Sequence, residues 1–87
     1  MEVYNVSLSD EAKKFFENTT DKLQKRLDRC FEQLKINPYV HSNIKPLKGK
    51  LAGYYRYRVG DYRVIYQVNE QVIQVLVTVI VHRSRAY

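Results

Sequence analysis

Three arginines lie close together in the second half of the sequence, on either side of a Gly60–Asp61 dipeptide: Arg56, Arg58 and Arg63. Such a dipeptide is typical of a two-residue hairpin turn, because glycine accepts the positive φ that the turn needs. Pairing outward from this turn places Arg58 opposite Arg63, and Arg56 opposite Ile65. The sequence therefore predicts a surface, here called the arginine face, on which three guanidinium groups crowd together.

Crowded cations on paired strands are unfavourable without a partner. Like charges directly opposite each other destabilise a strand pair by up to about 1 kcal/mol, and these two strands contain no acidic residue. A bound anion would remove the conflict, and the planar guanidinium fork binds phosphate through two parallel hydrogen bonds. We interpret the arginine face as a phosphate-binding site, with a merely solvated basic strand face as the alternative.

RNA held on this face could be cleaved without a metal ion. The 2′-hydroxyl can attack the neighbouring phosphorus to form a cyclic phosphate, and cations arranged in advance stabilise the charge that grows on the phosphoryl oxygens. His82 is the nearby side chain that titrates near neutrality, so it is a candidate proton donor, although a structural or surface role is the alternative. Tyr54 or Tyr87 could stack on a base.

The position of His82 depends on a second turn. If Asn69–Glu70 is also a two-residue loop, alternation places Gln74, Thr78 and His82 on the arginine face. Arg83 would then point the other way, unless the strand ends or bulges there. We expect one of these two irregularities.

The acidic residues and the cysteine do not indicate a metal or a cofactor. The basic half of the chain contains only Asp61 and Glu70, each in a predicted turn, which is too few for a carboxylate magnesium site. There is no Cys/His grouping for zinc, and Cys30, the only cysteine, cannot form an internal disulfide. We expect neither a metal nor a cofactor.

Positive charge is segregated along the chain. Residues 1–44 contain seven Lys/Arg and seven Asp/Glu, whereas residues 45–87 contain eight and two, so the net charge of +6 comes from the second half. Such segregation favours a polyanionic partner, either nucleic acid or an acidic protein. We expect four further cations to bind RNA: Lys45, Lys48 and Lys50 in a basic loop, and Arg85 in the tail.

The elements that position these residues fit in one domain, because 87 residues leave room for no more. Alternation predicts a strand over 2–8, and Ser9 begins a short helix. Apolar residues at three- and four-residue spacing predict a second helix that ends near Pro38, and strands follow over 54–59, 62–68 and 72–82. The predicted fold class is α+β: an N-terminal strand, a helical hairpin and a three-stranded antiparallel meander, in one sheet packed on the helices over residues 1–87.

The strands that carry the arginines have a second, apolar face. Alternation predicts that this face packs on the helices with the following residues: Tyr55, Tyr57, Val59, Tyr62, Val64 and Tyr66. The amino terminus shows no signal peptide, and the longest apolar run, residues 72–81, is too short to span a bilayer. We expect a cytoplasmic protein that does not act at a membrane.

The segment Tyr55-Arg-Tyr-Arg-Val-Gly-Asp-Tyr-Arg-Val-Ile-Tyr66, with His82-Arg-Ser-Arg-Ala-Tyr87 after a valine-rich strand, resembles the RelE branch of the RelE/ParE toxins. The resemblance covers essentially the whole chain. It implies the toxin of a type II toxin–antitoxin system that acts as an endoribonuclease, a ribosome-dependent messenger RNA interferase. The implied partners are a cognate antitoxin, messenger RNA and the decoding site of the ribosome, with DNA contacted only indirectly through the toxin–antitoxin complex.

The resemblance also implies roles for individual residues. Arg56 and Arg58 stand where some members have lysines, Arg63 and Arg83 would bind phosphate, and Tyr87 would be the stacking tyrosine. Arginine does not easily lose a proton, so Arg56 and Arg58 are poorer general bases than lysine would be.

Two other functions stay open. The ParE branch shares the fold and the arginine hairpin but poisons DNA gyrase without cutting RNA, and a basic nucleic-acid-binding module without catalysis is a third possibility. His82 and Arg83 together with Tyr87 favour the RelE side, because ParE-like chains usually lack that tyrosine.

Overall fold

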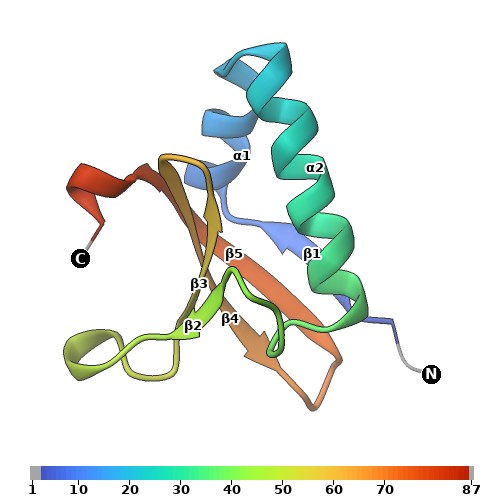
Figure 1. The fold of residues 1–87 in the computed structure, drawn as a ribbon. Helices are drawn as coiled ribbons and strands as arrows, with labels where there is room; N and C mark the ends of the chain where they lie inside the picture. The colour runs from blue at the N-terminus through green and yellow to red at the C-terminus, as the bar shows by residue number, and fades with distance from the viewer. Residues whose placement is uncertain (1–2, 87) are drawn as a thin grey trace.

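The computed structural model describes residues 3–86 and contains one mixed sheet beside two helices (Figure 1). The elements in chain order are β1 (Asn5–Leu8), α1 (Asp10–Asn18), α2 (Asp21–Ile36), β2 (Ile44–Pro46), the 3₁₀ turn η1 (Gly49–Leu51), β3 (Tyr55–Val59), β4 (Tyr62–Asn69), β5 (Gln74–His82) and the 3₁₀ turn η2 (Arg83–Arg85).

Side-chain caps begin both helices. The Ser9 hydroxyl accepts a hydrogen bond from the Ala12 amide at 3.1 Å, and the Thr20 hydroxyl accepts one from the Leu23 amide at 3.2 Å. Each cap satisfies one of the amide donors that a helix start leaves unpaired. The second helix ends where predicted, because the residue before Pro38 is sterically disfavoured in helical geometry.

The strand order is β1-β5-β4-β3-β2. Strand β1 runs parallel to β5, and the other three pairs are antiparallel. The α+β prediction is confirmed, with two additions. The basic loop contributes the short edge strand β2, and the N-terminal strand completes the opposite edge of the sheet.

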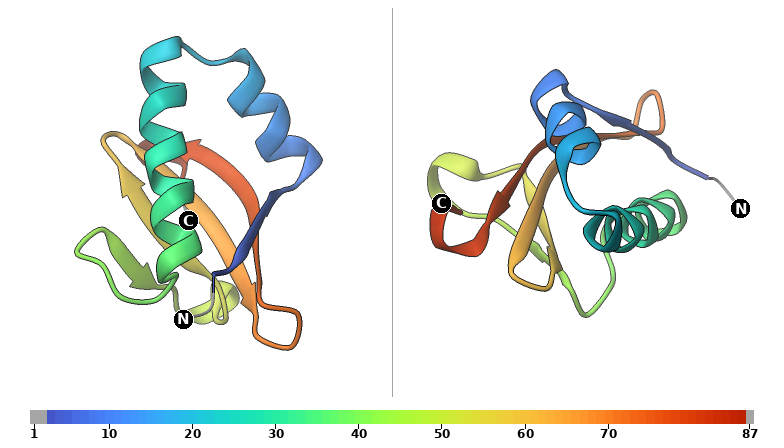
Figure 2. Two further views of the ribbon diagram at one scale, coloured as in Figure 1. Left: turned by 90° about the vertical axis from the view of Figure 1, so that its right-hand side faces the viewer. Right: turned by 90° about the horizontal axis from the view of Figure 1, so that it is seen from above.

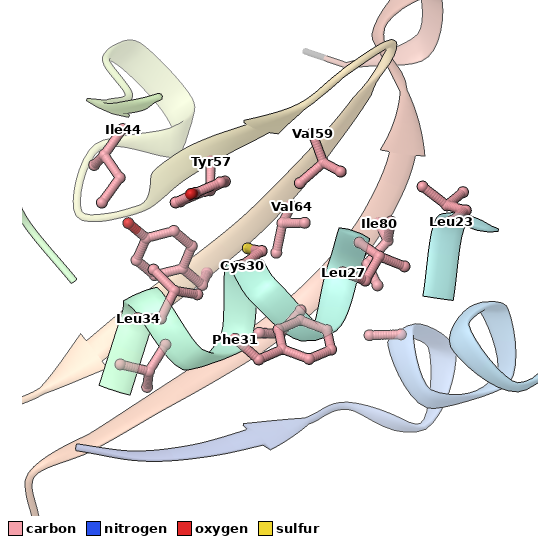
Figure 3. Close-up of a cluster of buried hydrophobic side chains, with 14 residues drawn as sticks. Leu23, Leu27, Cys30, Phe31, Leu34, Ile44, Tyr57, Val59, Val64 and Ile80 are labelled. Carbon is pink, nitrogen blue, oxygen red and sulfur yellow. The ribbon is translucent and has the colours of Figure 1, made fainter. Parts of the chain in front are cut away.

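The hydrophobic core lies between the sheet and the helices. The predicted apolar face of β3 and β4 does pack there, with Tyr57, Val59, Val64 and Tyr66 buried. They meet the apolar stripe of α2, which includes Leu27 (Figure 3). The hydroxyl of Tyr66 donates to the Pro38 carbonyl at 2.7 Å, so this buried polar atom is satisfied.

The hairpin between β4 and β5 differs from the prediction in two ways. The predicted two-residue turn at Asn69–Glu70 is wrong, since Asn69 pairs with Gln74 and residues 70–73 form the loop. The register also shifts at Ile65/Tyr66, where Thr78 is the extra residue on β5. The Thr78 hydroxyl donates to the Ile65 carbonyl at 2.9 Å. A bulge of this kind reverses which face each later residue of the strand occupies.

The two faces of the sheet have different neighbours. Both helices lie on one side, whereas the segment between β2 and β3 and the C-terminal segment lie on the other (Figure 2). The arginine face is therefore the side without helices. Within residues 3–86, no helix is long and apolar enough to cross a membrane.

Candidate nucleic-acid interface

The predicted register of the arginine hairpin is confirmed. Gly60 has a φ of 57° in a two-residue turn, Arg58 pairs with Arg63, and Arg56 pairs with Ile65. The backbone thus brings the three arginines to adjacent positions on paired strands.

At rest, two of the three side chains bind backbone carbonyls of different segments. Nη1 of Arg56 donates to the Asn43 carbonyl at 2.7 Å, whereas Nη1 of Arg63 donates to the carbonyls of Gly60 at 3.1 Å and Tyr62 at 3.0 Å. The side chain of Arg58 is exposed and bonds to no other residue within 3–86. All of these acceptors are neutral carbonyls, so the positive charges are not neutralised.

Arg83 comes to the hairpin turn because of the bulge. Its amide donates to the Asp61 carbonyl at 2.7 Å, and its Nε lies 3.7 Å from Oδ1 of Asp61. β5 ends at His82 and Arg83 begins η2, so one of the two expected irregularities, the end of the strand, occurs here. Both charged groups are exposed, so solvent weakens this ion pair.

A basic hollow of about 470 Å³ lies beside the arginine face, where β2 meets β3, and is here called the loop hollow. Lys45 pairs with Arg56 across these strands, and both line the hollow together with Lys48. The remaining lining residues are apolar: Pro46, Leu47 and Leu51. The third predicted RNA-binding lysine, Lys50, is exposed on η1 and does not line the hollow. Cations beside an apolar surface are suited to a nucleotide, because its phosphate is charged and the flat face of its base can stack on apolar side chains.

The predicted placement of His82 on the arginine face is wrong. The bulge pairs it with Tyr62, and the two rings form an edge contact with centroids 5.4 Å apart. Tyr62 in turn contacts Phe15 of α1, on the helix side of the sheet. Nδ1 of His82 accepts a hydrogen bond from the Ser84 amide at 3.2 Å. His82 therefore caps η2 and lies on the opposite face from Arg63.

The remaining tail residues do not join the arginine face in the described part of the chain. Arg85 lines a hollow with Phe15, Tyr62 and His82, beside α1. Tyr87, the predicted stacking residue, lies outside the described residues. Tyr54 precedes β3 and is partly buried.

Ile65 lies on the arginine face, as alternation predicts, and with its neighbour Val79 it forms an apolar surface there. It is only 5% exposed, although it lies outside the main core cluster. One feature beside this hairpin was not predicted. Arg26 and Arg29 of α2 line a pocket with Arg58 and Gly60. Their three-residue spacing on one helix face was the available signal, but nothing in the sequence indicated that this face meets the hairpin.

Acidic residues are scarce around the interface. In the part of the chain that the structure describes, the only ion pairs are Arg83 with Asp61 and Lys35 with Glu32. No group of three or more His, Cys, Asp or Glu side chains within residues 3–86 is placed to hold a metal ion. Apart from the exposed pair of Arg83 with Asp61, the cations of the arginine face and the loop hollow have no acidic partner within residues 3–86.

Comparison with known proteins gives one family and a set of similar folds. The sequence model of a family described as the ParE toxin of the type II toxin–antitoxin system parDE matches residues 4–87. No curated protein matches the chain in sequence.

Several solved structures share the fold. The archaeal RelE–RelB complex from Pyrococcus horikoshii OT3 contains a chain 27% identical, with a TM-score of 0.82, over 97% of this chain and 99% of that one. The RelBE2 toxin–antitoxin complex from Mycobacterium tuberculosis gives 24% identity and a TM-score of 0.79, over 93% and 99% of the two chains. The YoeB/ParE toxin from Agrobacterium tumefaciens gives 19% identity and a TM-score of 0.81, over 90% and 96%.

Proposed function

Because this chain belongs to the RelE/ParE superfamily of toxins from type II toxin–antitoxin systems, we propose that it is an endoribonuclease that cleaves messenger RNA on the ribosome. The observation that carries the proposal is the cationic surface formed by the arginine face and the loop hollow. Among the described residues, its arginines and lysines bind at most neutral carbonyls, apart from the exposed pair of Arg83 with Asp61.

The resting contacts of Arg56 and Arg63 are compatible with phosphate binding. A phosphate carries a full negative charge, which attracts a guanidinium more strongly than the dipole of a carbonyl does, and it can accept two parallel hydrogen bonds from one arginine. A phosphate oxygen can therefore replace the carbonyls that Arg56 and Arg63 bind at rest. Long side chains on rigid strands need only rotate to make this exchange, because the backbone already holds their stems in adjacent positions.

The proposed reaction breaks one phosphodiester bond. The 2′-oxygen forms a bond to phosphorus and loses its proton to solvent, while the bond from phosphorus to the 5′-oxygen breaks and that oxygen takes up a proton. Arg63 and Arg83 stabilise the negative charge that develops on the phosphoryl oxygens. Arg56, Lys45 and Lys48 hold the neighbouring nucleotide in the loop hollow. His82 is assigned to the support of η2 rather than to proton transfer.

A cognate antitoxin is proposed as the regulatory partner. Two of the similar structures are toxin–antitoxin complexes, from Pyrococcus horikoshii and Mycobacterium tuberculosis. An antitoxin that binds the arginine face would need carboxylates to meet its charge.

Inhibition of DNA gyrase is the second candidate function. It is favoured by the description of the matching family, which names the ParE toxin. The binding of Arg56 and Arg63 to backbone carbonyls and the displacement of His82 also fit a basic surface that binds without cleaving.

Mapping the 5′ ends of messenger RNA after brief induction of the toxin separates the two candidates. The ribonuclease proposal predicts new ends at fixed codon positions, which disappear when the antitoxin is co-expressed. Intact messenger RNA together with broken chromosomal DNA would instead identify a gyrase poison. An inactive Arg63→Ala variant, induced to the same level, controls for the general effect of stopping growth.

A further inference from the structure

We propose that a groove between α2 and the end of β3 next to the Gly60 turn binds backbone phosphates of a nucleic acid, at a second site distinct from the loop hollow. This α2 groove has a volume of about 350 Å³. Six of its lining residues matter here: Arg26, Arg29, Cys30, Asn43, Arg58 and Gly60. Two arginines thus come from a helix that contributes nothing to the arginine face.

The arginines of the helix have no internal partner. Arg26 and Arg29 are both exposed, and neither forms an ion pair or a side-chain hydrogen bond with another residue in the described range. Glu32, one turn beyond Arg29, is bound to Lys35 at 2.6 Å instead. The positive charge of the groove is therefore available to an external anion.

The cations follow one stripe of the helix. Lys22, Arg26 and Arg29 are four and three residues apart, which separates them by about 6 Å and 4.5 Å along the axis. Like charges at these spacings destabilise a helix. Lys22 and Arg26 also line a neighbouring hollow with Asp61, and the carboxylate of Asp61 is paired with Arg83. A stripe that is unfavourable by itself becomes favourable when a chain of phosphates lies along it.

The stripe reaches the arginine hairpin at its turn. The guanidinium of Arg26 lies against Gly60, where an added Cβ would be 2.7 Å from Nη2 and 2.9 Å from Nη1. Gly60 also provides the carbonyl that Arg63 binds on the other side of the hairpin. The two basic surfaces therefore meet at this turn, and Arg58 contributes to both.

Regular spacing favours a nucleic acid over an acidic protein as the ligand. A polynucleotide presents successive phosphates along its backbone, which suits a row of cations along a helix axis. This inference rests on the proposed function for the class of ligand, but it does not depend on cleavage. The phosphates can belong to RNA or to DNA, and the experiment separates these sources.

Binding of labelled duplexes by the full-length chain, measured by fluorescence anisotropy over a range of salt concentrations, tests the proposal. The RNA duplex is 2′-O-methylated, so that attack by the 2′-hydroxyl cannot occur, and a DNA duplex has the same sequence. The double variant Arg26→Gln with Arg29→Gln removes two cations from the groove. Its matched control, Lys13→Gln with Lys14→Gln, removes two exposed cations from α1.

The groove variant should show a shallower dependence of log K on log salt, by about 0.9 for each lost phosphate contact. The control should keep the slope of the unmodified chain, as should Arg26→Lys with Arg29→Lys, which preserves the charges. A shallower slope with both duplexes identifies phosphate alone as the ligand. A shallower slope with the RNA duplex only indicates that the ribose also contributes. Both results support the proposal.

Two results would overturn it. One is an unchanged slope in the groove variant relative to the α1 control, with both proteins folded by circular dichroism. The other is loss of polyglutamate binding while both duplexes bind as before, which would identify the groove as a site for an acidic protein. If messenger RNA is not cleaved but the groove variant still shows the shallower salt dependence, the phosphate site in the α2 groove is supported and the ribonuclease proposal fails.

Discussion

At the scale of single residues, strand pairing fixes the positions of the arginines on the arginine face, whereas their guanidinium groups are not fixed in a phosphate-binding arrangement. Arg63 bonds to two carbonyls of its own turn, Arg56 bonds to Asn43, and the side chain of Arg58 has no bond within residues 3–86. Each bond joins a charged donor to a neutral acceptor, so a phosphate competes well for the same donor. The stems are placed by strand pairing, which a ligand does not need to change.

Arg63→Ala should abolish most of the cleavage activity and leave the fold intact. Loss of one charge-stabilising donor lowers kcat by a factor of about 10² to 10³. The free energy of unfolding should change by no more than about 1 kcal/mol, because solvent can replace the lost hydrogen bonds to the turn carbonyls. Single-turnover cleavage of ribosome-bound messenger RNA measures the first effect, and urea unfolding measures the second. Cleavage at the full rate by the folded variant would refute the assignment of Arg63.

His82→Gln should leave the pH profile of cleavage unchanged. His82 lies against Tyr62 on the helix side of the sheet, with Nδ1 bound to the Ser84 amide, so it is not placed to donate a proton at the arginine face. The measurement is single-turnover cleavage from about pH 5.5 to 8.5, a range that brackets the usual histidine pKa of about 6.5. If the pH profile of the variant lacks an ionisation near neutrality that the unmodified chain shows, His82 takes part in catalysis.

At the scale of elements, the turn between β3 and β4 positions residues of both basic surfaces: it pairs Arg58 with Arg63, and Arg26 lies against its Gly60. Gly60→Ala should lower the free energy of unfolding by about 1 to 2 kcal/mol, because a Cβ is strained at a φ of 57°. It would also displace the guanidinium of Arg26, which a flexible side chain tolerates at smaller cost. Urea unfolding of Gly60→Ala and Gly60→Asn measures this, and the asparagine variant should be the more stable because asparagine adopts this conformation more readily. Equal stability of the alanine variant and the unmodified chain would show that the turn relaxes.

The bulge in β5 is the other element-scale feature that positions site residues. Because Thr78 is the extra residue, Val79 and Val81 pair with arginine-face residues of β4, while Ile80 enters the core. The same shift turns His82 away and brings Arg83 to Asp61. A single inserted residue thus removes His82 from the arginine face and brings Arg83 beside the hairpin turn.

At the scale of the whole molecule, the core contains titratable groups kept in their neutral forms. Burial raises the pKa of Tyr66 and of Tyr57, and it also raises the pKa of the Cys30 thiol. In the unfolded chain these groups ionise at their ordinary values, 10.0 for tyrosine and 9.0 for cysteine. The folded state therefore binds more protons than the unfolded state in alkaline solution.

Stability should consequently be constant with respect to these groups below about pH 9 and fall as the pH rises further. Thermal unfolding from neutral pH to about pH 11 measures the loss. Tyr66→Phe should reduce this alkaline loss, because one group no longer ionises on unfolding. At neutral pH the same variant should be less stable by about 1 kcal/mol, since the Pro38 carbonyl loses its donor. An unfolding temperature that stays level to pH 11 would contradict this account.

The local features of the fold could be predicted from the sequence. The Gly60–Asp61 turn determines which residues of β3 and β4 face each other, so the register and the core face followed from alternation alone. The β4–β5 loop could not be predicted in the same way. Its four residues include Ile73 at a positive φ of 51°, which its residue type does not indicate, and the bulge depends on a hydrogen bond from Thr78 to a residue thirteen positions earlier.

For the candidate sites, the sequence by itself determined the segregation of positive charge and the adjacent positions of Arg56, Arg58 and Arg63, because both depend on chain order and on a short turn. Only the tertiary structure decided which other residues lie beside these charges. The Asn43 carbonyl that holds Arg56, the lysines that complete the loop hollow, and the approach of α2 to Gly60 all join different elements of the fold. Such contacts arise from packing α2 and β2 around the hairpin, and no spacing along the chain specifies that packing.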